Sequence, residues 1–385
     1  MDAINSLKGI INSIHTKKGV YTGKSAEYHL ICNEICRSAS MSGTPLAYFD
    51  GWMHLFTGTH WEKIDDFELK IFLKFAYAKL CGDNVSASRK ELVNGFASQM
   101  PYTAMTLNTR QVRGKINFMN GTLDLASMRL APHNCNDFFR YVLTYGYSPT
   151  ADCPMFKRYL SEVVPEKEAR EVLAEYVAWL FLPWLKLEKV LFLYGFGCNG
   201  KSVFVEIMEA LVGKDNVSHE SLSDLCGEYG ANSRSNLAGK LLNTCSDVAP
   251  NAFAGDLFKR IASGEPISTK ILYKDVTTLA DYAKMMFCLN ELPKTRDNSN
   301  GFYRRFLIVP FRVQIPKSRI DPDLPRKIIG NELPGIMNWV LQGAKRLAKN
   351  RRFTDSPMVD EALEEYISRN TKKKFSLILP ARFRK

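Results

Sequence analysis

The stretch that most constrains the fold of this chain is Gly195–Ser202, which reads GFGCNGKS. It matches the pattern G-x-x-x-x-G-K-[ST] of a phosphate-binding loop at every fixed position. Residues 190–194 form a short apolar run typical of a buried strand, and residues 203–212 carry apolar residues at helical spacing. A strand, a glycine-rich turn and a helix are the context in which this motif binds phosphate. The motif therefore predicts a nucleotide site at the start of a helix.

The chemistry of such a loop assigns roles to its residues. Glycines let backbone N–H groups turn toward phosphate oxygens, and the N-terminus of the helix adds positive potential. Lys201 is expected to reach the β- and γ-phosphates, and Ser202 to hold Mg²⁺. The expected cofactors are therefore ATP and Mg²⁺. The predicted ATP-binding residues are Gly195, Gly197, Asn199, Gly200, Lys201 and Ser202.

Length and composition indicate a soluble protein with more than one domain. The 385 residues exceed what one ordinary core holds, and 45% hydrophobic with 24% charged residues is typical of globular chains. The sequence has no apolar run of about 18 residues or more, and its first residues do not resemble a signal peptide. We therefore expect a cytoplasmic protein, encoded by a bacterial host or a mobile element, with no membrane partner.

Charge and cysteine content narrow the class of partner. The formal net charge is +12, which favours a polyanionic partner, although part of the excess lies in the C-terminal tail. The nine cysteines are scattered. Cys32 and Cys36 lie near His29 at a spacing that a metal site could use, but no second pair supports one, so buried thiols are favoured.

The order of patterns along the chain predicts its organisation. Turn-forming residues at 147–154 mark a boundary. After it, strands alternate with helices, which predicts a mainly parallel sheet. The predicted domains are an N-terminal α+β domain (1–150), an ATPase domain with preceding helices at 154–182 (151–315), and a helical segment with a basic tail (316–385). The predicted local elements are hairpins at 48–56 and 116–130, a helix at 67–80, and strands at 240–245, 284–289 and 305–310.

Hydrolysis requires groups beyond the phosphate-binding loop, and three later positions are candidates. Asp247 ends the strand at 241–247 and could bind the metal, although a lone aspartate there could also be a cap. Asn290 ends the strand at 285–289, where an amide can touch the γ-phosphate or form an Asx-turn. Arg304 and Arg305 precede a strand at 306–309 and could stabilise a neighbour's transition state, or could lie in ordinary surface ion pairs.

These pieces, in this order, resemble superfamily 3 helicases. The likeness is to the helicase half of phage and plasmid primase-helicases, and more distantly to the poxvirus primase-helicase. It spans roughly residues 45–365 and is specific as a set. The segments that carry it are 195–202, 237–247, 258–274, 288–293 and 301–311, with 120–125 and 145–154 upstream.

The resemblance implies a fold class and an assembly. The fold is α/β, an AAA+-type P-loop ATPase domain with a mainly parallel sheet, preceded by a smaller α+β domain and followed by a short helical region. The assembly is a ring, usually a hexamer, with ATP between subunits and movement along single-stranded DNA. Asp247 takes the acidic position, Asn290 the sensor position, and Arg305, ahead of Arg304, the position of the arginine finger.

The resemblance also places residues 258–275 in a hairpin that lines a central channel. Lys270, Tyr273 and Lys274 form a basic and aromatic tip suited to a phosphate backbone and a stacked base, although surface lysines on a solvated hairpin would look the same. In the N-terminal domain Trp52, Phe56 and Trp61 could stack on bases, but aromatic residues in a hairpin are more often core.

Two functions remain open at this point. The first is a ring-forming, ATP-dependent DNA helicase of phage, plasmid or mobile-element replication. The second is a DNA-stimulated ATPase that acts as a loader or initiation factor without unwinding. A metabolic P-loop kinase is disfavoured because it leaves the strand-end Asn290 and the paired arginines unexplained. The first 45 residues are too few for a primase domain, so a separate primase or polymerase is an expected partner.

Overall fold

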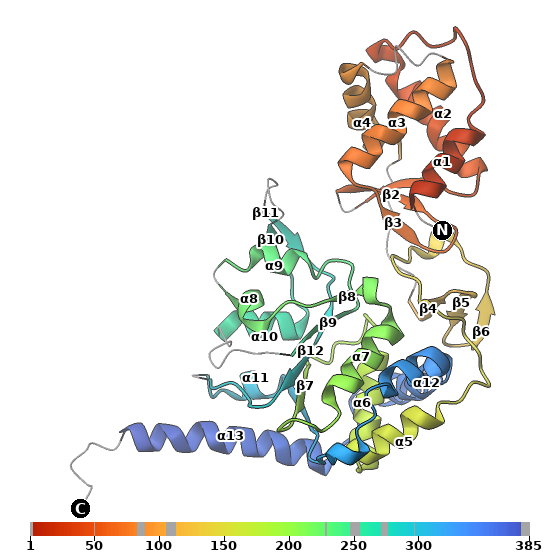
Figure 1. The fold of residues 1–385 in the computed structure, drawn as a ribbon. Helices are drawn as coiled ribbons and strands as arrows, with labels where there is room; N and C mark the ends of the chain where they lie inside the picture. The colour runs from red at the N-terminus through yellow and green to blue at the C-terminus, as the bar shows by residue number, and fades with distance from the viewer. Residues whose placement is uncertain are drawn as a thin grey trace, which may run out of the picture. The chain divides into compact units, whose positions relative to one another are not determined.

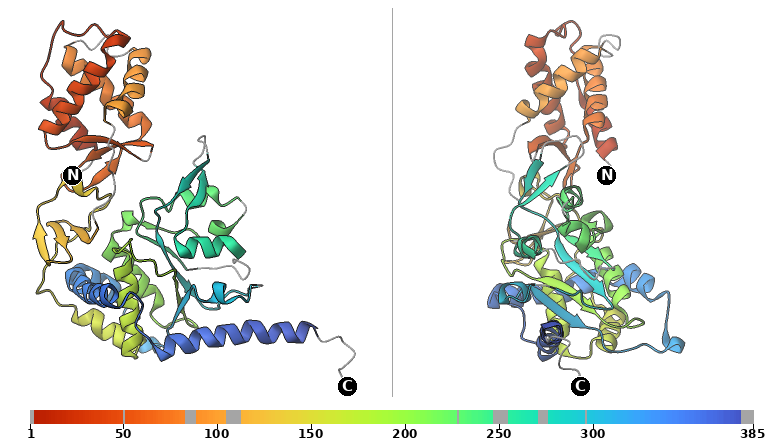
Figure 2. Two further views of the ribbon diagram at one scale, coloured as in Figure 1. Left: turned by 180° about the vertical axis from the view of Figure 1, so that it is seen from behind. Right: turned by 90° about the vertical axis from the view of Figure 1, so that its left-hand side faces the viewer.

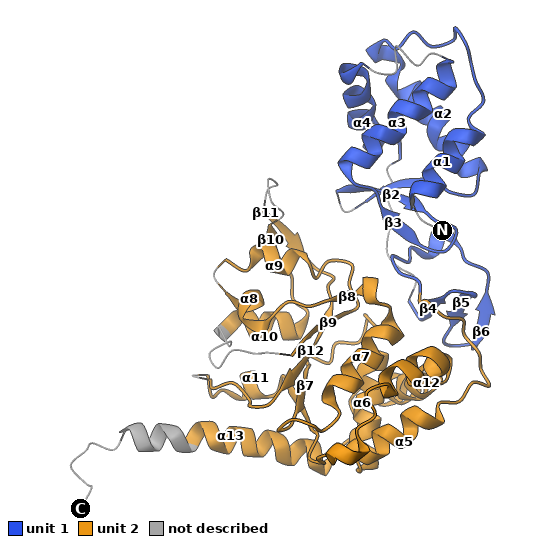
Figure 3. Ribbon diagram, in the orientation of Figure 1, with its two compact units in different colours: residues 1–142 blue, residues 143–385 orange. Residues whose placement is uncertain are grey.

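The chain divides into two compact units, residues 1–142 and residues 143–385, in its computed structural model (Figure 3). The structure describes residues 3–49, 51–82, 89–104, 113–227, 229–246, 255–270, 276–295 and 297–378. The division falls just ahead of the turn-rich segment at 147–154, and the C-terminal helices belong to the second unit.

Four helices and a small sheet build the core of the first unit (Figure 1). The sheet has the order β1-β2-β3 and is antiparallel. One of its faces supplies Leu46, Met53 and Leu55 to the helical core, because alternate residues of a strand point to the same side. The bounds are α1 Ala3–Ser13, α2 Tyr28–Met41, β1 Leu46–Phe49, β2 Trp52–Phe56, β3 Trp61–Lys63, α3 Asp66–Cys81 and α4 Lys90–Thr103.

The opposite face of this sheet carries an aromatic cluster. Phe56 and Trp61 are buried there with Phe49, and the Trp61 indole N–H donates to the Cys135 carbonyl oxygen at 2.7 Å. These two aromatic residues are therefore core, whereas Trp52 is only half-buried. A second antiparallel sheet follows in the order β4-β5-β6, with bounds Lys115–Phe118, Gly121–Asp124 and Arg129–Ala131.

The second unit is built around a parallel sheet of five strands in the order β13-β7-β12-β9-β8. Residues Val190–Tyr194 form β7, which lies between β13 and β12 and is almost wholly apolar, as expected for a strand covered on both faces. The other strands are β8 Val217–Ser218, β9 Leu242–Cys245, β12 Lys284–Leu289 and β13 Phe306–Pro310. This arrangement confirms the predicted mainly parallel sheet.

Helices cover both faces of the sheet (Figures 1 and 2). On one face α10, α11 and α13 pack against β7, β12 and β13, and Phe192, Phe258 and Phe306 form the centre of that core. On the other lie α6 and α7, and the buried Tyr176 hydroxyl of α6 donates to the Met285 carbonyl oxygen. The bounds are α5 Pro154–Val163, α6 Lys167–Trp179, α7 Lys201–Val212, α8 Leu222–Cys226, α9 Ala231–Ser235, α10 Gly255–Ser263 and α11 Asn300–Tyr303.

Two long helices and a two-stranded hairpin complete the second unit. Helices α12 (Leu324–Asn350) and α13 (Pro357–Ile378) confirm the predicted C-terminal helical region. Strands β10 (Ile267–Lys270) and β11 (Val276–Leu279) pair with each other and lie outside the five-stranded sheet. Among the described residues, no helix combines the length and the hydrophobicity that crossing a bilayer requires.

Candidate nucleotide site

The glycine-rich loop joins β7 to α7 in the conformation that its sequence requires. Gly197 and Gly200 have φ angles of +96° and +84°, a region that glycine enters without strain. A side chain at Gly195 would also clash, because its Cβ would lie 2.1 Å from the Asn199 side-chain nitrogen and 2.4 Å from the Phe311 carbonyl oxygen. Gly195 is thus needed for close packing, and Gly197 and Gly200 are needed for the turn.

Residues far away in the sequence hold this loop in place. The Tyr159 hydroxyl of α5 donates to the Gly200 carbonyl oxygen at 2.7 Å, and burial raises the pKa of Tyr159 well above its usual value. The Asn199 amide donates to the Phe311 carbonyl oxygen at 2.9 Å, and the Ile315 N–H donates to the Cys198 carbonyl oxygen at 2.8 Å. The loop is therefore fixed from α5 and from the segment after β13. No motif in the sequence marks Tyr159 or Ile315 for this role.

Lys201 is the centre of the site. Its side chain is buried, and its ammonium group donates to the Gly195 carbonyl oxygen at 2.5 Å and to the Asn199 side-chain oxygen at 3.0 Å. A third contact, 3.3 Å long, reaches the side-chain oxygen of Asn290. Burial lowers the pKa of Lys201. Strand β12 lies next to β7, and Asn290 directly follows β12 beside the loop. The structure therefore brings Lys201 and Asn290, two of the predicted site residues, together.

The surroundings of Lys201 fit a bound triphosphate. Helix α7 begins after Gly200, and no side chain in the described part of the chain caps its first backbone N–H groups, which leaves them for an anion. Ser202 is exposed in that first turn, where its hydroxyl could serve as a ligand of Mg²⁺. Asp247, the predicted acidic ligand, lies outside the described residues.

The predicted DNA-binding hairpin is present as β10 and β11. Lys270 ends β10 and is exposed, whereas Tyr273 and Lys274 lie outside the described residues. The buried Arg234 of α9 anchors the hairpin, with its Nε donating to the Ser268 carbonyl oxygen at 2.8 Å and its Nη1 to the Leu225 carbonyl oxygen at 2.9 Å. Nothing in the sequence marks Arg234 as an anchor, because a basic residue in a short helix carries no pattern that indicates burial.

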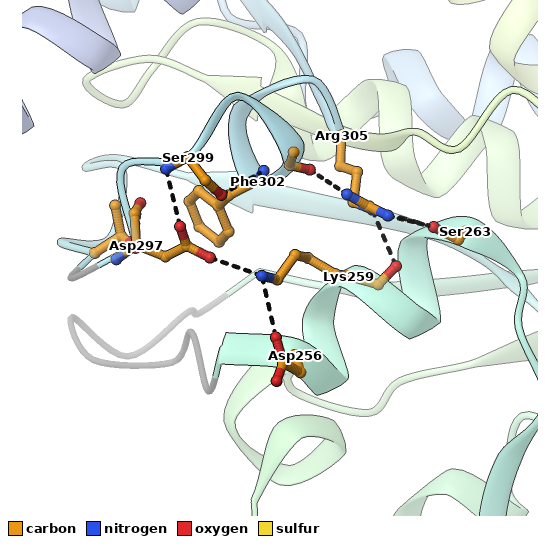
Figure 4. A network of polar contacts seen from close by, with 9 residues as sticks. Asp256, Lys259, Ser263, Asp297, Ser299, Phe302 and Arg305 are labelled. Carbon is orange, nitrogen blue, oxygen red and sulfur yellow. Dashed lines mark hydrogen bonds and ion pairs between the residues drawn. The ribbon is translucent and has the colours of Figure 1, made fainter.

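Arg305 is bound within its own chain. The residue is 8% exposed, and its guanidinium group donates to the Lys259 carbonyl oxygen at 3.1 Å, to the Ser263 hydroxyl at 2.8 Å and to the Gly301 carbonyl oxygen. Figure 4 shows this network, in which Lys259 also bridges Asp256 and Asp297. Arg305 therefore ties α10 to α11, and these contacts leave little of it for a neighbouring subunit.

Arg304 has different surroundings. Its side chain is 61% exposed, and its Nη2 lies 2.6 Å from Oε2 of Glu188, which precedes β7. Glu188 has a φ of +52°, an uncommon conformation for a residue other than glycine. Both arginines precede β13, so they lie at the edge of the sheet opposite the phosphate-binding loop. Of these two predicted candidates for the arginine finger, Arg304 is exposed and Arg305 is buried.

Two family profiles match separate parts of the chain. The profile described as D5 N terminal like matches residues 37–165, and a family of unknown function, DUF5906, matches residues 193–305. The second match begins in β7 and ends at Arg305, so it contains the phosphate-binding loop, the hairpin and Asn290.

Known proteins resemble the chain at low identity. A protein of Acanthamoeba polyphaga mimivirus named as a presumed helicase is 25% identical over 206 residues, which is 51% of this chain and 21% of that protein. The chain thus matches about a fifth of this relative's length. Two solved structures of the C-terminal region of NrS-1, both without ligand, superpose with TM-scores of 0.53 and 0.54 at 10% identity. These alignments cover 84% and 86% of this chain, and 75% and 74% of those chains, so the fold is shared. The chain therefore carries a D5 N-terminal-like region followed by a DUF5906 region, resembles a presumed helicase at low identity, and shares the fold of the NrS-1 C-terminal region.

Proposed function

We propose that this chain is an ATP-dependent DNA helicase of superfamily 3 that works as a ring, most simply a hexamer, on single-stranded DNA. The observation that carries the proposal is the contact between Lys201, at the end of the loop that joins β7 to α7, and Asn290, which follows β12. A cation for the phosphates and an amide beside them come from neighbouring strands, as ATP hydrolysis requires. The replication of a phage, plasmid or other mobile element is the proposed setting.

The roles of the other groups follow from their places on the sheet. Bound Mg²⁺ would neutralise phosphate charge, with Ser202 and Asp247 as its proposed ligands. Asn290 would orient the attacking water once Lys201 turns from its three protein acceptors toward the phosphates. Arg304 lies at the opposite edge of the sheet from its own loop, and therefore we propose that it serves the site of a neighbouring subunit.

The hairpin would link hydrolysis to DNA. Lys270 is exposed at the end of β10, and the chain returns from β11 through Tyr282 into β12, which leads to Asn290. The Tyr282 hydroxyl donates to the Glu265 carbonyl oxygen at 2.9 Å, at the base of the hairpin. The short segment from β11 through β12 thus connects the hairpin to the proposed nucleotide site. We propose that Lys270, Tyr273 and Lys274 contact the DNA backbone and bases.

The test is ATP turnover and strand displacement by the full chain. Lys201→Ala should lower turnover by about 10²- to 10³-fold or more, the usual cost of losing one preorganised charge donor. Lys214→Ala is a matched control, because Lys214 is an exposed lysine of the same unit. Near-normal turnover by Lys201→Ala would refute the site. ATP turnover that is stimulated by DNA but does not displace a strand from a forked substrate would favour the loader or initiation factor instead.

A further inference from the structure

The peptide group that joins Gly200 to Lys201 is held by a side chain from another helix. Its carbonyl oxygen accepts the Phe204 N–H of α7 at 3.1 Å and the Tyr159 hydroxyl of α5 at 2.7 Å. The N–H of the same peptide group belongs to Lys201, the first residue of α7. Because a trans peptide is planar and its N–H points away from its C=O, a bond that fixes the carbonyl also fixes the direction of the N–H.

Tyr159 packs against Gly200 as well as donating to it. The tyrosine is buried, and a Cβ on Gly200 would lie 3.1 Å from Cε2 of Tyr159 and 2.9 Å from Cγ1 of Val163. Burial raises the pKa of Tyr159 well above its usual value, so the hydroxyl keeps its proton and remains a donor at neutral pH. A hydrogen bond to the carbonyl also polarises the peptide group and strengthens its N–H as a donor. The Lys201 N–H is thus both oriented and strengthened from α5.

A buried carboxylate on α12 fixes the start of α5. The two side-chain oxygens of Glu332 accept the backbone N–H groups of Met155 and Phe156, each at 2.9 Å. These N–H groups belong to the first turn of α5, where a helix has no acceptors of its own for them. The negative charge of Glu332 also lies at the positive end of the helix dipole. Glu332 therefore caps α5, although it lies 177 positions after Met155.

The backbones of α12 and of the segment that begins α5 meet at the same place. A Cβ on Gly335 would lie 2.2 Å from the Asp152 carbonyl oxygen and 2.9 Å from the Cys153 backbone nitrogen, so glycine permits this close approach. The Phe156 ring packs edge-on against the Trp339 ring, with 5.1 Å between their centres. Helix α5, which contacts the phosphate-binding loop, and helix α7, which follows the loop, both pack against α12 (Figure 1).

We propose that Tyr159 and Glu332 are positioning residues of the nucleotide site. Glu332 fixes the first turn of α5, and α5 carries Tyr159 one turn further on. The Tyr159 hydroxyl then directs the Lys201 N–H toward a phosphate oxygen of the bound nucleotide. This role rests on the proposed function, because it requires that the loop bind nucleotide phosphate. The affinity of the loop is thus set in part by two helices outside its motif.

The test is the affinity for ADP, measured by isothermal titration calorimetry on the full chain. Tyr159→Phe removes only the hydroxyl and should weaken ADP binding about three- to tenfold, the size of one hydrogen bond. Tyr176→Phe is the matched control, because it removes a buried hydroxyl that donates to the Met285 carbonyl oxygen, near the end of β12 that is far from Asn290. The control should leave ADP affinity unchanged. Equal losses in the two variants, or wild-type affinity of Tyr159→Phe, would overturn the proposal.

Glu332 is tested through its dependence on Tyr159. Glu332→Gln keeps the size of the side chain but removes its charge and one acceptor oxygen, and it should weaken ADP binding about two- to threefold. If Glu332 acts through Tyr159, the double variant should bind ADP no more weakly than Tyr159→Phe alone. Losses that multiply in the double variant, or full affinity of Glu332→Gln, would overturn the role of Glu332.

Phosphorus NMR of bound ADP reports on the phosphate itself. The signal of the β-phosphate should move in Tyr159→Phe and stay in place in Tyr176→Phe, because only the first change alters the Lys201 N–H that faces the phosphate. A signal that is the same in Tyr159→Phe and in the unaltered chain would contradict the proposed orientation of this N–H.

Hydrogen exchange on the unaltered chain tests the same coupling even if a variant misfolds. ADP should slow exchange in the peptide that contains Met155 and Phe156 as well as in the peptide that contains the loop. Protection confined to the loop would overturn the proposal. Failure of the unaltered chain to bind ADP is a separate result, because it would refute the nucleotide site and with it the proposed function.

Discussion

At the residue scale, the candidate nucleotide site depends on one buried ammonium group. Lys201 reaches three oxygen atoms of the protein, yet burial lowers its pKa because those partners do not replace all of the lost hydration. The ammonium group is thus held where a phosphate would enter, and a bound phosphate would replace the hydration that the group lost on burial. This favours binding of an anion over an empty site at neutral pH.

The lowered pKa gives a prediction with a definite sign. Nucleotide binding requires the charged form of Lys201, so the affinity for ADP should fall as pH rises through this lowered pKa, before exposed lysines titrate near about 10.4. Isothermal titration calorimetry between about pH 7 and about pH 10 measures the effect. Lys201→Arg is the control, because a guanidinium stays protonated over this range and its affinity should change less with pH. An equal pH dependence in both proteins would contradict the prediction.

Substituting Arg304 and Arg305 one at a time should show which of the two stabilises the fold. Arg305→Ala removes donors from the Lys259 and Gly301 carbonyl oxygens and from the Ser263 hydroxyl, which should lower the free energy of unfolding by about 2–4 kcal/mol. Arg304→Ala breaks an exposed ion pair and should change it by less than about 1 kcal/mol. Urea unfolding followed by circular dichroism gives both values. A larger loss from Arg304→Ala than from Arg305→Ala would contradict this assignment.

The sequence predicted residues that belong to a local motif and missed those that act across the fold. The glycines, Lys201 and Asn290 could be predicted because each has a fixed place relative to a strand. Tyr159 acts on the loop from a helix that lies 41 positions earlier, and nothing in its neighbourhood indicates that contact. The choice between Arg304 and Arg305 also required the fold, because adjacent residues leave a chain in different directions and the sequence does not show which one is buried.

At the element scale, the strands and long helices could be predicted from the periodicity of the sequence. The residues that fix these elements in place could not. The apolar run of β7 and the hairpin at β1 and β2 are local patterns, and the structure has both. The placement of β10 and β11 depends on Arg234, which reaches Ser268 across 34 positions. Gly230 makes room for it, because a Cβ there would lie 2.9 Å from the Arg234 Nη1 and 2.1 Å from the Asp224 carbonyl oxygen.

Arg234 should therefore couple the hairpin to the rest of the second unit. Arg234→Ala leaves the Ser268 and Leu225 carbonyl oxygens without this donor and should loosen the base of the hairpin. We expect basal ATP turnover to fall less than twofold and its stimulation by single-stranded DNA to be largely lost. Arg234→Lys, which keeps the charge but not the two-pronged geometry, should recover only part of the stimulation. Full stimulation in Arg234→Ala would show that the hairpin does not need this anchor.

At the scale of the whole molecule, the sheet separates the two groups of residues that the proposed catalytic site needs. The phosphate-binding loop follows β7 at one edge, and Arg304 precedes β13 at the other, although the two strands are neighbours. A parallel sheet holds these edges apart by the length of its strands, so one chain does not supply both to the same nucleotide. Under the proposed function, the site is complete only between two copies of the chain, and in a closed ring every copy both gives and receives an arginine.

This arrangement predicts complementation between two inactive variants. Lys201→Ala lacks the lysine that would bind the phosphates, and Arg304→Ala lacks the proposed arginine finger. Where the two variants are neighbours, the Arg304→Ala subunit can supply Lys201 and the Lys201→Ala subunit can supply Arg304, so one boundary site is intact. In an equal mixture that assembles at random, about a quarter of the boundaries are intact, so turnover should recover to about a quarter of the wild-type value. Phosphate release measured over a series of mixing ratios should peak at the equal mixture. The control is an equal mixture of Lys201→Ala with the double variant Lys201→Ala/Lys214→Ala. Both proteins lack Lys201, so this mixture should remain inactive. Recovery at no ratio, in samples whose mass confirms mixed assemblies, would mean that Arg304 does not act on a neighbouring subunit.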